Sequence, residues 1–225
     1  MLDLLDEEEI KEIRRKLDPF ITEVTKMTGR SSAEYQQFRE EMIKWIPQFD
    51  KTLRVWNDML RSLTYIEHEA KADPRAVSTI KLFIYLGLVE MYGVDLLNSL
   101  ILLLIASGRT LHIEREHGTP RVIHASTLDH LQSTGVTLAT KLKFLEENGL
   151  SAIARLIDRD LRNDIAHLNF EIEDNGKIRT NHSGNVDIDQ KIEKFNRIFR
   201  VVMTMMNVDI VLPFKQKLEH NVSGE

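Results

Sequence analysis

The most apolar run of the chain extends from Ile80 to Ala106 and sets the strongest limit on its fold. The run contains Glu90, Asp95 and Asn98, and charged side chains are costly at the centre of a bilayer. It is therefore a poor membrane span and a good core helix, expected from about Pro74 to Ser107. Such a helix has to be covered by other amphipathic helices.

Composition agrees with a soluble globular chain of 225 residues, 42% of them hydrophobic and 29% charged. That length supports one substantial core, or one core with an appended helical segment. The chain has no cysteine, which excludes disulfides, cysteine-based zinc sites and a thiol nucleophile. Its acidic N-terminus lacks the pattern of a signal peptide. We expect a cytoplasmic protein with no membrane contact.

The formal net charge of −5 argues against a protein that coats nucleic acid without selectivity, since such proteins are basic. A few arginines can still set the local potential of a cleft. Any RNA binding is expected to be local.

Helical periodicity predicts three N-terminal helices. The first covers Leu4–Met27 and is bent or restarted at Asp18-Pro19. The second reaches Ile46, and Pro47 starts the third, which runs to about Ala70. Trp45 and Trp56 could stack on bases, but their helical spacing with other apolar residues favours the core.

A boundary is expected at Ala72-Asp73-Pro74. We therefore predict an N-terminal helical extension over residues 1–72 and a helical bundle over residues 73–225.

The segment Gly108–Ala125 is expected to be a loop. With the next helix it holds four histidines, namely His112, His117, His124 and His130. Their spacing matches no helical pair and no zinc finger, so metal binding is the weaker alternative to a mobile loop over a site. No metal and no cofactor is expected.

Three further helices are predicted, over Leu128–Asn148, Ser151–Leu168 and Asp187 to about Leu218. Between the last two, Asn175-Gly176 separates alternating segments, which is the pattern of a β-hairpin with a type I′ turn.

The helix Ser151–Leu168 carries the candidate site in the sequence Arg-Asn-Asp-Ile-Ala-His. Asn163 lies one helical turn before His167, and Arg159 one turn before Asn163, so the three form a column. Arg162 and His167 lie roughly 140° apart around the axis and flank a groove for a phosphate or for the same helix of a second copy. The plain alternative is a cationic solvent face whose terminal histidine interacts with the helix dipole.

The spacing of Arg162, Asn163 and His167 at the end of a long helix resembles the active-site signature of the HEPN superfamily. The resemblance covers roughly Pro74 to the C-terminus. It implies an all-α, HEPN-like four-helix bundle over that range. The N-terminal helical extension lies outside the resemblance, and the small β-hairpin after the motif helix is an insertion that only some family members have. Arg61 and His68 fit the looser spacing without the asparagine.

The resemblance implies metal-independent cleavage of RNA, with attack of the 2′-hydroxyl on the adjacent phosphorus to give a 2′,3′-cyclic phosphate. Arg162 suits the charge that builds on the phosphate oxygens, and His167 suits proton transfer. Asn163 would orient the imidazole or hold a phosphate oxygen. Arg159 and Arg155 are candidate RNA-binding residues. Glu90 is a candidate supporting residue, or else a buried acid bonded to a neighbouring tyrosine or lysine.

The family implies a homodimer, which would supply a second histidine to the phosphate, and a role in defence or as a toxin held by an antitoxin or another regulatory protein. The main alternative is a helical dimerisation or partner-binding module that keeps the motif as a structural network, with Arg162 paired to Asp164 or Glu90. A third hypothesis is a metal-dependent hydrolase that uses the loop histidines with Glu114 and Glu116.

Overall fold

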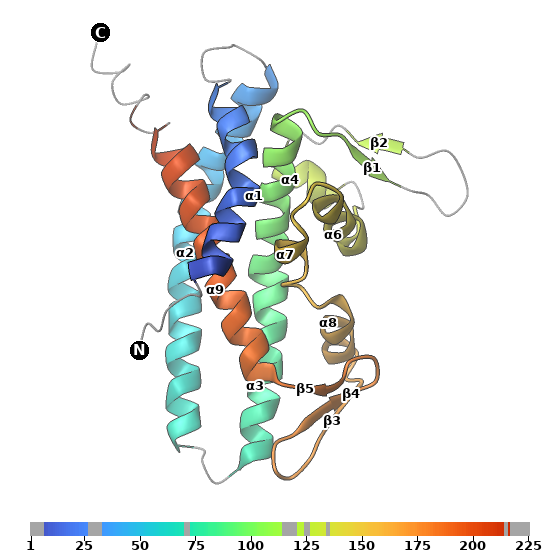
Figure 1. The fold of residues 1–225 in the computed structure, drawn as a ribbon. Helices are drawn as coiled ribbons and strands as arrows, with labels where there is room; N and C mark the ends of the chain where they lie inside the picture. The colour runs from blue at the N-terminus through green and yellow to red at the C-terminus, as the bar shows by residue number, and fades with distance from the viewer. Residues whose placement is uncertain are drawn as a thin grey trace. The chain divides into compact units, whose positions relative to one another are not determined.

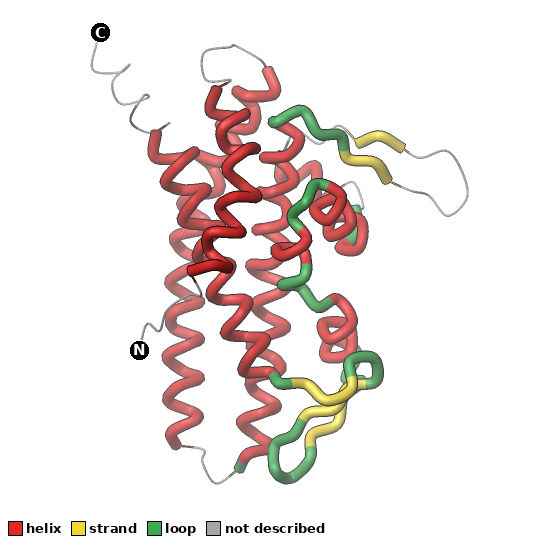
Figure 2. Tube along the Cα trace, viewed as in Figure 1, coloured by secondary structure: helices red, strands yellow, loops and turns green. Residues whose placement is uncertain are grey.

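The computed structural model describes residues 7–26, 33–69, 73–113, 121–123, 127–133, 136–213 and 216. Most of them are helical, and the strands form one two-stranded and one three-stranded antiparallel sheet (Figure 2). The mainly α class is therefore confirmed. A HEPN-type four-helix bundle is a finer statement and stays a prediction.

The chain divides into two compact units, each assembled from separate stretches. The first contains residues 1–46, 96–155 and 197–225, and the second contains residues 47–95 and 156–196. The predicted division into residues 1–72 and 73–225 stays a prediction, and residues 70–72 lie outside the described part of the chain.

Helices dominate the first unit. It contains α1 (Glu7–Lys26), the first part of α2 (Ala33–Glu69), most of α4 (Val94–Ala106), β1 (Leu111–Ile113), β2 (Arg121–Ile123), α5 (Leu128–Ser133), α6 (Leu138–Glu147), α7 (Ser151–Ala154), the end of α9 (Ile188–Met206) and η3 (Asn207–Val211). Leu17, Val24, Leu97 and Leu145 are fully buried there. Burial of such side chains is the main stabilising term of a helical unit.

The predicted start of a new helix at Pro47 is wrong, and no restart occurs at Pro19. α1 continues through Pro19 and α2 continues through Pro47. A proline inside a helix removes one backbone hydrogen bond and costs about 3 kcal/mol. Apolar side chains are buried on either side of each proline, including Leu17 and Phe20 in α1 and Met42 and Trp56 in α2. Their burial offsets that cost.

The region after α4 also differs from prediction. The expected loop 108–125 contains the β1–β2 hairpin, in which Leu111 pairs with Ile123. The expected single helix over Leu128–Asn148 is instead α5 and α6. Thr137 starts α6 anew, because its hydroxyl accepts the backbone N–H of Thr140 at 3.2 Å.

The second unit contains the N-terminal part of the long apolar helix and the elements that pack against it. It contains the remainder of α2, α3 (Pro74–Leu88), the π-helical turn η2 (Val89–Gly93), α8 (Arg159–Ala166), β3 (Phe170–Ile172), β4 (Ile178–Thr180), β5 (Gly184–Val186) and the start of α9. α8 and the sheet β3-β4-β5 lie beside α3 (Figure 1). Asp73 caps α3 by accepting the N–H of Ala76, and Pro74 takes its first position. The helix begins at Pro74 as predicted.

Trp56 belongs to the core of this unit, as predicted. Its side chain is 1% exposed, and its indole N–H donates to Asn196 Oδ1 at 2.9 Å. The centroids of the Trp56 and Tyr92 rings lie 5.7 Å apart. The side chain of Trp45 lies outside the described residues.

The hairpin after α8 forms where it was predicted, with Phe170 opposite Thr180, but its turn is not type I′. A type I′ turn needs positive φ at both central residues. Gly176 has φ +82°, whereas Leu168 is the only non-glycine residue with positive φ among those described, so Asn175 lacks it. Asn175 instead accepts the N–H of Lys177 with its side chain at 2.9 Å. The strand β5, which pairs with β4, was not predicted.

Gly176 also lets the hairpin pack closely against α3, because it has no side chain. A Cβ at this position would lie 3.0 Å from the carbonyl oxygen of Pro74. The hydroxyl of Ser78 donates to the Gly176 carbonyl at 2.7 Å.

The helix Pro74–Ala106 is the one described segment long and apolar enough to cross a membrane, yet 72% of its most apolar window is buried inside the protein. It therefore acts as a core helix, which is compatible with a soluble protein.

Candidate functional site

The motif lies on α8, a helix shorter than predicted. The expected helix over Ser151–Leu168 is interrupted between α7 and α8. Asp158 causes the restart, because its carboxylate accepts the N–H of Leu161 at 3.0 Å and so caps α8.

Further contacts hold the start of α8. Lys191 on α9 donates to the Asp158 carboxylate at 2.7 Å, and the Tyr85 hydroxyl accepts the Asp158 N–H at 3.3 Å. Burial alone would raise the pKa of Asp158, but the hydrogen bonds from Lys191 and from the backbone lower it overall. Burial raises the pKa of Tyr85. The start of the motif helix is thus anchored to α3 and α9.

Arg162 is held by two neighbours within the second unit. Its Nε donates to Glu90 and its Nη1 donates to Asn163 Oδ1 at 2.9 Å. None of the described residues hydrogen-bonds Nη2, and the side chain is 31% exposed. An arginine carries five N–H donors, so this one keeps donors for an anion such as a phosphate.

Glu90 reaches Arg162 from η2, the π-helical turn in the middle of the apolar helix. π-helical turns occur frequently at functional sites. The predicted supporting residue therefore does meet the motif. It is an exposed acid paired to arginine, in contrast to the buried acid bonded to tyrosine or lysine that was the alternative.

His167 closes α8. Its backbone N–H donates to the Asn163 carbonyl at 3.0 Å, so these two residues lie one turn apart as predicted. Its side chain is exposed, and none of the described residues hydrogen-bonds the imidazole. Leu168 follows with φ +57° and a side chain 67% exposed. Left-handed backbone is unfavourable for leucine.

The two predicted RNA-binding arginines have different surroundings. Arg159, in the second unit, contacts Asp160 at 3.3 Å. Arg155 is exposed and belongs to the first unit. Arg159 and Arg162 are both paired to acids, so the cations of α8 are largely balanced before any ligand binds.

Sequence reasoning missed a second histidine. His182 lies in the turn between β4 and β5, and its Nδ1 is 2.6 Å from Asp164 Oδ1. Asp164 faces this turn rather than Arg162 and is fully buried, whereas the His182 side chain is 63% exposed. The only sequence signal was the turn composition Asn-His-Ser-Gly, which gives no indication of its partner.

The contact between Asp164 and His182 lowers the pKa of the aspartate and raises the pKa of the histidine. Burial would raise the pKa of Asp164, but hydrogen bonds from the His182 backbone, the His182 ring and the Thr180 side chain lower it overall. The hydrogen bond to Asp164 and its charge, with a further contribution from Asp160, raise the pKa of His182. The two shifts favour the charged form of each partner.

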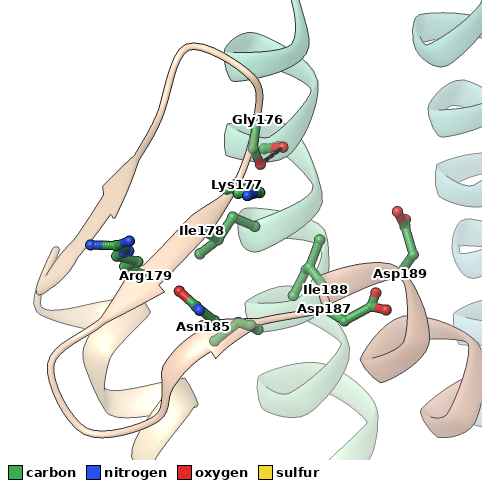
Figure 3. A pocket seen from close by; sticks show the side chains of 10 residues that line it. Gly176, Lys177, Ile178, Arg179, Asn185, Asp187, Ile188 and Asp189 are labelled. Atoms are coloured by element: carbon green, nitrogen blue, oxygen red, sulfur yellow. Dashed lines mark hydrogen bonds between the residues drawn. The ribbon is translucent and has the colours of Figure 1, made fainter.

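The pockets of the second unit lie away from the motif. One, of about 480 Å³, is lined by Ser78 on α3, by residues 176–179 and by residues 185–189 (Figure 3). Another, of about 490 Å³, is lined by Arg75, Thr79 and residues 170–173. No motif residue lines either pocket.

The side chains of the loop histidines and of the two nearby glutamates lie outside the described residues, namely His112, His117, His124, His130, Glu114 and Glu116. Within the described part of the chain no cluster of three metal-binding side chains occurs.

Fold and site together define a mainly α protein that carries an arginine, an asparagine and two histidines on and beside one short helix. Comparisons with family models, with curated proteins and with solved structures find no match to this chain.

Proposed function

We propose that this protein is a metal-independent endoribonuclease of HEPN type. The observation that carries the proposal is the grouping of Arg162, Asn163 and His167 on α8, with Arg162 oriented by Glu90. An exposed histidine and a pre-oriented arginine on one short helix are suited to chemistry on a phosphodiester.

The proposed reaction begins when His167 takes the proton of the RNA 2′-hydroxyl, whose oxygen attacks the adjacent phosphorus. Arg162 stabilises the charge on the phosphate oxygens through its remaining donors. Asn163 keeps Arg162 in place through their 2.9 Å hydrogen bond. The products are a 2′,3′-cyclic phosphate and a 5′-hydroxyl. Arg159 would contact the RNA backbone beside the motif, and Arg155 is proposed as a separate RNA-binding residue of the first unit.

We propose a homodimer in which α8 of each copy faces the other. Exposed apolar side chains support it, because Leu168, Phe83 and Met91 are 67%, 48% and 46% exposed in the second unit. Apolar side chains of this kind gain stabilisation when two copies associate and bury them. The family resemblance further suggests a cytoplasmic toxin or defence effector that is held by an antitoxin or regulatory protein.

One observation favours a non-catalytic alternative. Arg162 already satisfies two donors within the chain, through Glu90 and Asn163, as a structural network would. In a helical module for dimerisation or partner binding, the network would hold α8 to η2 and carry out no chemistry.

The test is cleavage of a mixed-sequence RNA in excess EDTA by wild type and by His167→Ala. The proposal expects cyclic phosphate ends from wild type and a loss of about 10²–10⁴-fold in the variant. Arg61→Ala and His68→Ala are matched controls, because both residues are exposed on α2 and fit only the looser motif spacing. Wild-type protein without activity, or equal activity of His167→Ala, would count against a nuclease.

A further inference from the structure

The turn between β4 and β5 presents a histidine on a buried carboxylate. Asp164 Oδ1 lies 2.6 Å from His182 Nδ1, and Asp164 Oδ2 accepts the His182 backbone N–H at 3.0 Å. The carboxylate therefore fixes both the backbone and the ring of His182. Since Nδ1 is engaged and the side chain is 63% exposed, Nε2 is the nitrogen left for a ligand.

This turn lies against the end of the motif helix. The backbone N–H of Asn181 donates to the Asn169 carbonyl at 3.3 Å, and the N–H of Asn169 donates to the Asp164 carbonyl at 2.8 Å. Asp164 and His167 are three positions apart on α8, a spacing that puts Cβ atoms about 5–6 Å apart. His182 is therefore anchored to the helix that His167 closes, with the Asp164 carboxylate buried and both imidazoles exposed.

A buried aspartate bonded to Nδ1 has a defined chemical effect. It keeps the proton on Nδ1, orients the ring and stabilises the imidazolium, which leaves Nε2 free to donate or accept a proton. The charged groups that act on His182 are Asp164 and Asp160, both from α8 and both negative. Together they favour the protonated ring, the form that a general acid requires.

We propose that His182 is the general acid of the RNA cleavage reaction, with His167 of the same chain as the base and Asp164 as the positioning residue. This inference rests on the proposed endoribonuclease function. As the 2′-oxygen forms its bond to phosphorus, the 2′-hydroxyl proton passes to His167. As the bond from phosphorus to the 5′-oxygen breaks, His182 Nε2 gives its proton to that oxygen. Solvent then returns a proton to His182 and removes one from His167.

One chain then holds both proton-transfer groups for a phosphate. A second copy is not required to supply an imidazole, and the proposed dimer would serve RNA binding. The competing explanation is that Asp164 and His182 only lock the β4–β5 turn to α8.

The experiment compares two RNA substrates in EDTA, one ordinary and one with sulfur in place of the bridging 5′-oxygen. A thiolate leaves without a proton, because thiols have pKa values near 8.5. On ordinary RNA, His182→Ala is expected to lose about 10²–10⁴-fold in rate, and on the sulfur substrate to come within about tenfold of wild type. His167→Ala is expected to stay impaired on both substrates, since the attacking hydroxyl still needs a base.

His182→Asn keeps the proposal testable if the alanine variant unfolds. The asparagine amide can still donate to Asp164 but cannot act as an acid near neutral pH. It should show the same rescue by sulfur and should lose the alkaline limb of the pH–rate profile. Asp164→Asn should shift that limb to lower pH.

The outcomes separate the two proposals. Wild-type protein that cleaves neither RNA overturns both. Activity that depends on His167 while His182→Asn is equally impaired, or equally active, on both substrates overturns the role of His182 and leaves the nuclease intact. His68→Ala is the matched control and is expected to match wild type on both substrates.

Discussion

Glu90 and Arg162 are 72 positions apart in the sequence and form an ion pair that joins the π-helical turn to the motif helix. The pair is partly exposed, and exposed pairs contribute only about 0–1 kcal/mol to stability. Its main effect is orientation, because it directs the guanidinium toward the surface that also carries Asn163.

Replacing Arg162 therefore tests whether the ion pair serves catalysis or the stability of the fold. As a nuclease residue, Arg162→Ala is expected to lower the cleavage rate by about 10²–10³-fold, with a small change in melting temperature. Glu90→Gln should reduce the rate less, because the amide oxygen can still accept a hydrogen bond. The measurements are single-turnover cleavage and thermal unfolding. A large fall in melting temperature for Arg162→Ala would favour the non-catalytic module.

The Asp164–His182 pair predicts a pH window of stability. The pKa of Asp164 is lowered from 3.8, so its contribution is present above that pH and is lost as pH falls through the lowered value. The pKa of His182 is raised from 6.5, so its contribution is present below that pH and is lost as pH rises through the raised value.

The difference in melting temperature between wild type and His182→Asn should therefore be largest between these limits. It should shrink as the pH rises through the raised pKa of His182 or falls through the lowered pKa of Asp164. Thermal unfolding across this range measures it. A difference that does not change with pH would show that the pair carries no charge-dependent stability.

Gly176 and Gly184 form a matched pair for the packing of the hairpin on α3. Both have positive φ, +82° and +66°, so alanine strains the backbone at each. Only Gly176 also approaches Pro74, while nothing lies within 4 Å of a Cβ at Gly184. Gly184→Ala is expected to cost about 1–2 kcal/mol, and Gly176→Ala more. Urea unfolding measures both, and equal costs would mean that the hairpin yields without penalty.

We expect a glycine at position 168 to stabilise the monomer and to weaken the proposed dimer. Leu168→Gly is expected to stabilise the monomer by about 1 kcal/mol, because glycine adopts positive φ without strain. The same change removes an exposed apolar side chain and should weaken the proposed dimer. Sedimentation at micromolar concentrations and urea unfolding measure the two effects. Wild-type protein that stays monomeric there would contradict the dimer.

Sequence patterns predicted the helical class, the core helix from Pro74 and the hairpin after the motif, because each rests on local periodicity or local turn chemistry. They failed at Pro19 and Pro47, where burial of neighbouring side chains outweighs a local penalty. They also failed at Asp158, whose cap restarts a helix in an otherwise regular apolar pattern.

The candidate site was predictable only where its residues share α8. Arg162, Asn163 and His167 follow from helical spacing, and Glu90 was named because of the family resemblance. His182 could not be found this way, because its link to Asp164 depends on where the β4–β5 turn lies in three dimensions. No period in the sequence connects the two residues.

A π-helical turn contains one residue more than the α-helical turn it replaces, so η2 behaves as a one-residue insertion in an otherwise regular helix. Deleting one exposed residue there, such as Met91, would let the helix close as a regular α-helix while the buried faces before and after it stay in phase. The core helix is expected to survive the deletion, while the backbone that presents Glu90 to Arg162 would lose its π-helical geometry. Deleting one residue would therefore alter the candidate site while the core helix stays folded.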